Sequence, residues 1–325
     1  MKKIHDIAAV VGALLALVAC ADDARQETVG QADLQVNTSM SGATRTASYN
    51  GLQETELNPS VKAAVYVYRE GTTAKTSGYG YENIEYKYEN EAWKHSTVFF
   101  PADHTDVDVF VYAPRASSPE GVTTIPVTVA TDQSTQAGYL ASDFVFGKTN
   151  VDYAYPRATP NVTLYHALSK LILNFTDVNG ATSTLGTLTK VQLGTATYAV
   201  RLNAYVNITT TISAVADIAT TNAVTTLADY GIVTMLDVSK ETTDTPWSMA
   251  CILPPQTLPT EGTNLTLTFS TGKTYEGILS ATLVAGYTHT YTVKIDQETL
   301  TFSGVTIHPW GNGWGDADPP SRIIY

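Results

Sequence analysis

Apolar and polar residues alternate with a period of two along most of this chain. The clearest run is Asp106 to Tyr112, in which Val107, Val109 and Val111 share one face. Such alternation is typical of a β-strand with one face turned to a core. Similar runs predict strands at 33–38, 61–68, 83–88, 97–100, 162–175, 189–200, 250–253, 265–269, 274–283, 289–295 and 300–307. A helix is expected, if anywhere, in 212–230, where Ala and Val cluster.

Turn signals rich in Gly and Pro separate these runs, notably at 113–121 and 147–160. Many short strands divided by turns predict an all-β fold built of β-sandwiches. The pattern divides the chain into an apolar leader, a tether with a first strand and a cleavable loop, an N-terminal β-sandwich, and a C-terminal β-sandwich with a tail. The expected bounds of these four parts are 1–19, 20–60, 61–157 and 158–325.

The first 19 residues combine a basic start with a short apolar stretch, and Leu17-Val18-Ala19-Cys20 follows at its end. This arrangement predicts a secretory signal, and the stretch is shorter than the roughly 20 residues that cross a bilayer. The four residues resemble the bacterial lipobox, in which the chain is cut before a lipidated Cys. The resemblance implies that Cys20 carries a lipid anchor, and an ordinary signal peptide cut near Cys20 is the alternative. Asp22 and Asp23 resemble the signal that exports Bacteroidota lipoproteins to the outer face of the cell.

A short strand and a polar loop follow the tether. Leu34 and Val36 lie on one side of the strand at 33–38, and the loop at 39–60 is rich in Gly, Ser and Thr. Arg45 is the one basic residue between Arg25 and Lys62. Exposed loops are where chains are cut by proteases, so Arg45 is a candidate cleavage site, with a solvated loop Arg as the alternative.

Composition narrows the range of functions. The chain has 19 Lys and Arg against 31 Asp and Glu, a net charge of −12. A chain this acidic, without a basic cluster, does not suit nucleic acid, because phosphate binding needs Lys and Arg. Once Cys20 is lipidated only Cys251 remains, which leaves no intramolecular disulfide and no Cys-based metal site.

Candidate chemistry is sparse. The His residues lack metal-ligand spacing, and there is no nucleophile elbow or phosphate-binding Gly loop. His166 is expected to be a hydrogen-bonded structural residue. Glu82, Glu85, Glu89 and Glu91 lie near aromatic residues, so the paired carboxylates of a glycosidase compete with a solvated strand face. We expect no enzyme, no cofactor and no metal.

Aromatic residues gather in the first half of the chain. Tyr79, Tyr81, Tyr86, Tyr88 and Trp93 are close in sequence and could form a recognition platform, because Tyr gives contact area at low entropic cost. Ordinary strand residues are the alternative. A platform would suit a surface lipoprotein that binds a glycan or a protein and does not polymerise.

Four segments resemble the fimbrillin family of Bacteroidota, the subunits of surface fimbriae. They are HALSKL at 166–171, LPPQTL at 253–258, GYTHTYTV at 286–293 and the stretch 305–310 that closes on Trp310. The resemblance covers roughly residues 30–315. It implies two tandem transthyretin-like β-sandwiches, a lipid anchor in the outer membrane, and assembly with other fimbrial subunits.

The resemblance also implies how assembly begins. In the family an Arg-specific protease cuts a loop near the N-terminus, here between Arg45 and Thr46. The cut releases the first strand, here that of Leu34 and Val36, and the vacated site accepts a strand from another subunit. This donor-strand exchange is a form of β-augmentation.

The donor strand is expected at the C-terminus, where Ile323, Ile324 and Tyr325 are apolar. Three Gly and two Pro make the rest of the tail after Trp310 a poor strand. A stalk, tip or accessory role therefore stays open. The function expected is a structural or accessory fimbrial subunit that serves adhesion to a host or bacterial surface ligand.

Overall fold

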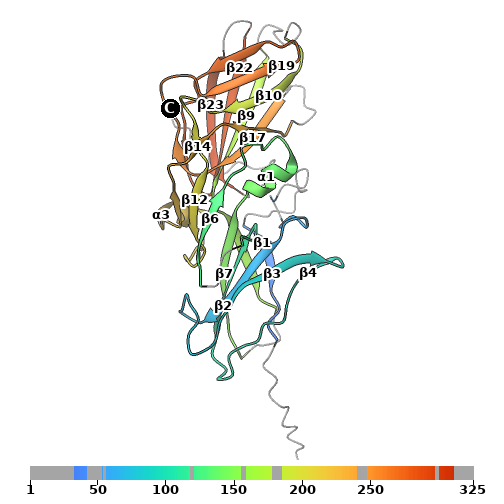
Figure 1. The fold of residues 1–325 in the computed structure, drawn as a ribbon, viewed down its shortest axis with the longest axis vertical. Coiled ribbons are helices and arrows are strands. Elements are labelled where there is room, and N and C mark those ends of the chain that lie inside the picture. Colours follow the sequence, from blue (N-terminus) through green and yellow to red (C-terminus); the bar gives the residue numbers. More distant parts are fainter. Residues whose placement is uncertain are drawn as a thin grey trace, which may run out of the picture.

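The computed structural model describes most of the chain. The described residues are 33–41, 53, 56–117, 121–154, 159–177, 185–239, 247–296 and 300–310. They form an elongated molecule made largely of β-strands, with one group of sheets at each end (Figure 1). Cys20, Arg45, Thr46, Ile323, Ile324 and Tyr325 lie outside the described residues.

A seven-stranded sheet forms one end of the molecule, with the order β1-β8-β7-β5-β2-β3-β4 (Figure 1). Its neighbours are antiparallel except β1 and β8, which run parallel. The strands are β1 (Asn37–Met40), β2 (Ala63–Arg69), β3 (Tyr81–Glu89), β4 (Ala92–His95), β5 (Val107–Ala113), β7 (Val145–Val151) and β8 (Asn161–His166).

The other end holds a five-stranded sheet, β16-β17-β9-β22-β23, and a four-stranded sheet, β15-β10-β19-β20. The strands of the first are β9 (Ser169–Asp177), β16 (Leu236–Asp237), β17 (Trp247–Leu253), β22 (Tyr287–Ile295) and β23 (Leu300–Pro309). Those of the second are β10 (Leu188–Leu193), β15 (Val233–Thr234), β19 (Leu265–Phe269) and β20 (Thr274–Gly277).

Smaller elements lie between the two ends (Figure 1). A three-stranded sheet joins β6 (Thr124–Thr128), β12 (Asn203–Asn207) and β13 (Val224–Thr226). The remaining elements are the two-stranded pairs and the helices: β11 (Val200–Arg201) with β14 (Tyr230–Gly231), β18 (Gln256–Thr257) with β21 (Thr282–Leu283), α1 (Gln136–Ser142) and α3 (Val215–Thr220).

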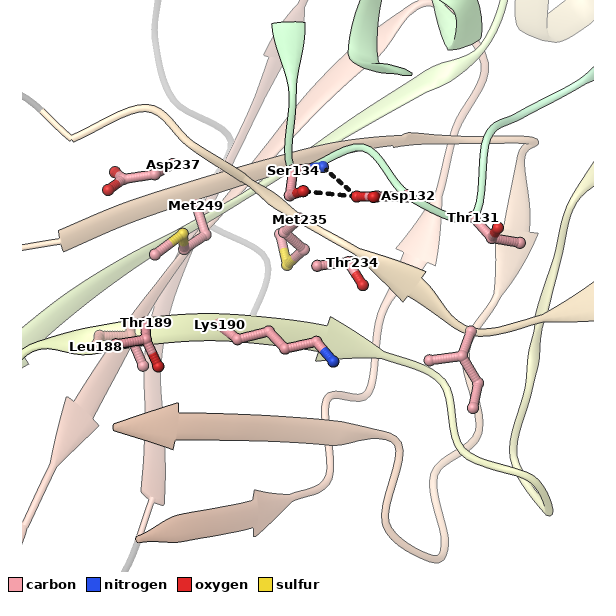
Figure 2. Close-up of a pocket in the computed structure, with 11 residues that line it drawn as sticks. Thr131, Asp132, Ser134, Leu188, Thr189, Lys190, Thr234, Met235, Asp237 and Met249 are labelled. Atoms are coloured by element: carbon pink, nitrogen blue, oxygen red, sulfur yellow. Dashed lines mark hydrogen bonds between the residues drawn. The ribbon is translucent and has the colours of Figure 1, made fainter. Parts of the chain in front are cut away.

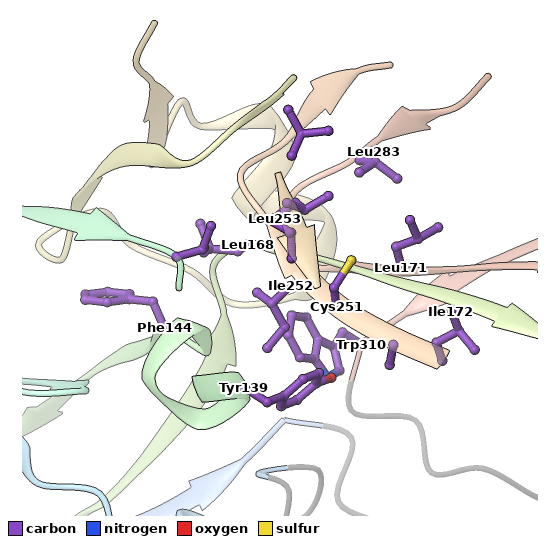
Figure 3. Packing of buried hydrophobic residues seen from close by; sticks show 14 of the residues in the cluster. Tyr139, Phe144, Leu168, Leu171, Ile172, Cys251, Ile252, Leu253, Leu283 and Trp310 are labelled. Carbon is purple, nitrogen blue, oxygen red and sulfur yellow. The ribbon is translucent and has the colours of Figure 1, made fainter. Parts of the chain in front are cut away.

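The central strands of the seven-stranded sheet are buried on both faces. In β2, Ala63, Val65 and Val67 face one apolar core, whereas the alternate Tyr66 and Tyr68 face another. All six residues from 63 to 68 are fully buried, as expected for a strand covered on both sides. The second core continues past α1 into the far sheets, where Trp310 packs beside Tyr139 and Ile252 (Figure 3).

The all-β prediction is confirmed. Five expected elements differ in detail. The run at 189–200 forms a strand, β10, only as far as Leu193, and the run at 274–283 is the two strands β20 and β21. The run at 162–175 is two strands, β8 and β9, in different sheets, and the segment 97–100 holds only an isolated bridge at Phe99. The helix expected in 212–230 is the six-residue α3, because β13 and β14 occupy the rest.

Three pairings cross the expected boundary between the sandwiches. β8 begins after residue 157 yet pairs with β7 and β1, and β6 pairs with β12 across a gap of many residues in sequence. The division at 157/158, and the two tandem transthyretin-like sandwiches, stay predictions.

Candidate functional site

The segment 33–41, called here the N-terminal segment, lies between two other parts of the fold. At its start Asp33 forms a bridge with Phe99, and the Leu34 N–H donates to the Val98 carbonyl at 2.8 Å. At its end β1 pairs in parallel with β8, matching residues 37–40 to 161–164. The segment therefore closes the space between the edge of β8 and the chain after β4.

The side chains of the N-terminal segment alternate between core and solvent. Leu34, Val36 and Met40 are 0%, 3% and 3% exposed, while Asp33 and Gln35 point outward. Burying each apolar side chain contributes roughly 1.5–3 kcal/mol. The segment is thus a packed part of the first core, as the alternation of Leu34 and Val36 predicts.

The backbone of the segment is bound to side chains as well as to strands. The Tyr86 hydroxyl, on β3, donates to the Val36 carbonyl at 2.9 Å. The Asn37 N–H donates to the Pro160 carbonyl at 2.8 Å. We call Tyr86, Val98, Phe99 and the 160–164 edge the strand seat.

The two chain positions that flank the loop with Arg45 are anchored close together. On one side the Ser41 N–H donates to the Leu164 carbonyl at 2.7 Å. On the other side Gln53, 1% exposed, donates from Nε2 to Asp143 Oδ2 at 3.2 Å, and Asp143 Oδ1 lies 2.7 Å from His166 Nδ1. Leu164 and His166 are two residues apart on β8. The anchors of Ser41 and Gln53, on the two sides of the loop with Arg45, therefore lie near the same end of β8.

His166 lies at the junction of the two ends of the molecule. Its ring stacks on Trp310 with centroids 3.8 Å apart and planes 3° from parallel. Lys170 Nζ lies 5.6 Å from the centre of the Trp310 ring, and Lys170 is 3% exposed. The HALSKL motif is thus a buried structural motif here, and His166 is hydrogen-bonded as the sequence predicts.

The aromatic cluster splits between core and surface. Tyr79 and Tyr86 are 9% and 1% exposed, whereas Tyr88 is 40% exposed. Trp93 is half-buried and stacks on Tyr86 with centroids 5.1 Å apart. The structure therefore does not present these rings as one open platform.

Three of the four clustered glutamates are bound to neighbours. Glu82 accepts from the Tyr68 hydroxyl at 3.0 Å, and Glu85 pairs with Lys62 at 3.0 Å. Glu89 pairs with the Nζ of a lysine on its own strand at 2.8 Å. Hydrogen bonding to Lys62 lowers the pKa of Glu85. Charge pairing on the strand face accounts for Glu85 and Glu89, and a hydrogen bond from a buried tyrosine accounts for Glu82.

A side pocket of about 530 Å³ opens where the chain passes from β15 to β16 (Figure 2). Met235 and Met249 form its apolar base, and Lys190 lies on its rim. The Ser134 N–H and hydroxyl donate to Asp132 at 3.0 and 2.6 Å, and these bonds lower the pKa of Asp132. Its described lining has no aromatic ring that would mark a sugar site.

The described residues contain no group of three or more His, Cys, Asp or Glu that could hold a metal ion. None of their helices is long and apolar enough to span a bilayer.

Sequence analysis identified Leu34 and Val36 but missed the contacts that hold them. Tyr86 was noted only as one ring of a cluster, and Gln53 lies in a segment with no apolar period. The one signal for the strand seat was the apolar run at 97–100. Its Val98 and Phe99 pair with the N-terminal segment.

Comparisons with known proteins agree with this architecture. A family model described as fimbrillin-like matches residues 44–310. A candidate cell adhesion protein from Bacteroides ovatus has a similar structure, with a TM-score of 0.61 at 18% identity, covering 86% of this chain and 98% of that chain. Another, from Bacteroides uniformis, gives 0.57 at 17% identity, covering 86% and 99%. At these identities the likeness is one of fold, and no curated protein matches the chain.

Proposed function

The chain belongs to the fimbrillin-like family, and from that premise we propose that it is a structural or accessory (tip) subunit of a cell-surface fimbria that serves adhesion. Its partners are other fimbrial subunits and a ligand on a host or bacterial surface. One observation carries the proposal. The N-terminal segment, which precedes the loop with Arg45, ends in a strand, β1, at the edge of the seven-stranded sheet.

Release of the N-terminal segment would leave a site for another strand. β1 pairs with one strand only, β8, at the end of the seven-stranded sheet. Without it, the β8 edge has unpaired N–H and C=O groups, which template pairing with another chain. The places of Leu34, Val36 and Met40 in the core would also be empty. An incoming strand gains ladder hydrogen bonds of about 1 kcal/mol each and apolar burial of about 25 cal/mol per Å².

The contacts of Ser41 and Gln53, on the two sides of the loop, support cleavage at Arg45 as the trigger of strand exchange. Ser41 and Gln53 are held on the two sides of the loop. A cut by an Arg-specific protease between Arg45 and Thr46 separates these anchors. The part before the cut leaves with Leu34 and Val36, and the part after it stays bound through Gln53.

The remaining parts of the proposal come from the family resemblance. Cys20 carries the lipid anchor that brings the precursor to the outer membrane. The donor strand includes Ile323, Ile324 and Tyr325 of a neighbouring subunit, which fill the strand seat by β-augmentation.

Replacement of Arg45 tests the proposal. Arg45→Ala is expected to leave an acylated chain that starts at Cys20 and does not enter filaments, because its N-terminal segment stays attached. Arg25→Ala is the matched control, since a cut there leaves the N-terminal segment in place. The measurements are the intact mass and N-terminus of surface-sheared protein, with filaments counted by electron microscopy. Filaments of normal abundance from Arg45→Ala would falsify the mechanism.

The alternative is a surface lipoprotein that binds a glycan or protein and does not polymerise. It predicts that the wild-type protein is found only in the form that begins at acylated Cys20. A monomer that binds a glycan array would then favour this function.

A further inference from the structure

The β3–β4 hairpin extends beyond the strand that supports it. β2 begins at Ala63, which pairs with Tyr86, so residues 87–94 have no β2 residue beside them. They pair only within the hairpin, and the tip turns through Asn90 and Glu91 with φ of 50° and 61°. Two successive positive φ values are the mark of a tight hairpin turn.

A β-bulge lies in the part of β3 that pairs with β2, before the part of the hairpin that extends beyond β2. The β2–β3 register shifts between Val65 and Val67, and Asn83 has a φ of 51°. A bulged strand bends and twists more strongly than a regular one. The bulge is held in place, because Arg115 donates to the Asn83 carbonyl at 2.9 Å.

The two faces of the hairpin differ in chemistry. Tyr86 pairs across the strands with His95, and Tyr88 with Trp93, so these rings share one face. The opposite face carries ion pairs, such as Lys87 to Glu89 at 2.8 Å. The aromatic face is the one that meets the N-terminal segment, since its innermost ring, Tyr86, binds the Val36 carbonyl.

We propose that the β3–β4 hairpin is a clamp on the strand seat, and that Tyr86 is its positioning residue. Tyr86 is 1% exposed and is held from outside by the stacked ring of Trp93. Its hydroxyl donates to a backbone carbonyl at 2.9 Å, and the half-buried Thr38 side chain also hydrogen-bonds to it. The clamp therefore holds a strand in register whatever side chain stands at its outward positions.

The clamp also specifies which strand it accepts from a partner, and this specificity rests on the proposed function. The partner is a β-strand from another subunit with apolar side chains two residues apart, in the places of Leu34 and Val36. Its outward positions, where Asp33 and Gln35 now stand, are free to vary. The carbonyl that replaces that of Val36 receives the Tyr86 hydroxyl.

The test compares amide hydrogen exchange in the uncut full chain and its variants. Tyr86→Phe removes one hydroxyl and keeps the ring. We expect the Leu34 and Asn37 amides to exchange about two- to tenfold faster, the range for one lost hydrogen bond of 0.5–1.5 kcal/mol. Amides of the β2–β5 ladder keep their rates. Trp93→Leu is expected to give a smaller increase at the same two amides.

The matched control is Tyr165→Phe. Its hydroxyl also donates to a backbone carbonyl at 2.9 Å, that of Ser213, and Tyr165 belongs to the other core. This control should leave the Leu34 and Asn37 amides unchanged. If Tyr86→Phe leaves exchange at these two amides unchanged, or accelerates exchange equally across the whole sheet, the proposal of a clamp is wrong.

The outcome is independent of polymerisation. The uncut chain needs no protease and no second subunit, so failure of Arg45 cleavage leaves the exchange result intact.

The partner specificity is tested separately in a chain cut after Arg45. A labelled peptide of residues 31–41 with Gln35→Thr should bind as well as the natural peptide and dissociate two- to tenfold faster from Tyr86→Phe. If peptide affinity depends strongly on residue 35, or if the peptide dissociates at the same rate from the wild type and from Tyr86→Phe, the proposed specificity is wrong.

Discussion

His289 shows how a single buried group sets a pH limit on this fold. It is fully buried on β22, and its Nε2 accepts the Val284 N–H at 2.9 Å. That nitrogen needs a free lone pair, so the folded protein holds a neutral imidazole. The pKa of His289 is lowered to about 4, mainly by burial, and the nearby His308 acts in the same direction.

Stability should therefore fall as the pH drops from about 6.5 towards 4. The unfolded chain binds a proton at its ordinary pKa of about 6.5, whereas the folded chain does not. Each pH unit in that window costs about 1.4 kcal/mol. His289→Gln, which keeps an acceptor for Val284, should flatten this slope in urea unfolding at pH 7 and pH 5. The exposed His104→Gln should not, and equal slopes in all three proteins would exclude His289 as the cause.

The stacked His166 and Trp310 show that the HALSKL motif has a structural role in this fold. His166 is bound through Nδ1 to Asp143 and covered by the Trp310 ring. Ala167 and Leu168 are fully buried as the chain crosses from β8 to β9. This motif joins the strand seat to the far sheets by packing and one buried hydrogen bond.

At the scale of elements, the position of β8 decides how well β1 is held. Gly147 on β7 faces β8 closely, and a Cβ there would lie 2.0 Å from the Thr163 carbonyl oxygen. That atom belongs to the backbone of β8, so it can move only with the strand. β8 in turn carries the whole ladder to β1.

Gly147→Ala should therefore push β8 outward and loosen the N-terminal segment. We expect a loss of about 1–3 kcal/mol in the free energy of unfolding, with faster hydrogen exchange at the Asn37 amide. Gly277→Ala is the matched control, because its nearest neighbour is a flexible Leu300 side-chain atom at 3.2 Å. Equal stability of Gly147→Ala and the wild type would contradict the close approach of β7 and β8.

Sequence patterns located strands better than they located the breaks between them. The alternation at 106–112 predicted β5, whose successive side chains face two different cores. The alternation at 265–269 predicted β19, whose successive side chains are buried and half-buried in turn. The break between β8 and β9 left no signal, since Ala167 and Leu168 are apolar and stay buried.

The same limit applies to the candidate site. The period of two found Leu34 and Val36, which are buried as expected. It could not find Tyr86 as their contact, because that hydrogen bond spans 50 residues. Long-range contacts depend on the sheet order, which local patterns do not determine.

At the scale of the molecule, one core unites the two ends. The core that includes Tyr66 and Phe110 on the seven-stranded sheet also includes Trp310 and Phe269 in the far sheets. Backbone pairing crosses the middle as well, since β6 pairs with β12 over five residues. Each end takes its strands from one continuous part of the chain, 37–166 and 169–309, and β6 is the strand of the first part that pairs with the second.

The described fold should therefore unfold as one unit. Fragments 61–157 and 158–325 should each fail to fold alone, because the first lacks β1 and β8 and the second lacks β6 beside β12. In the full chain, urea unfolding followed by Trp fluorescence and by far-UV circular dichroism should give coincident transitions. A protein with separate sandwiches would instead give two transitions and a folded 158–325 fragment.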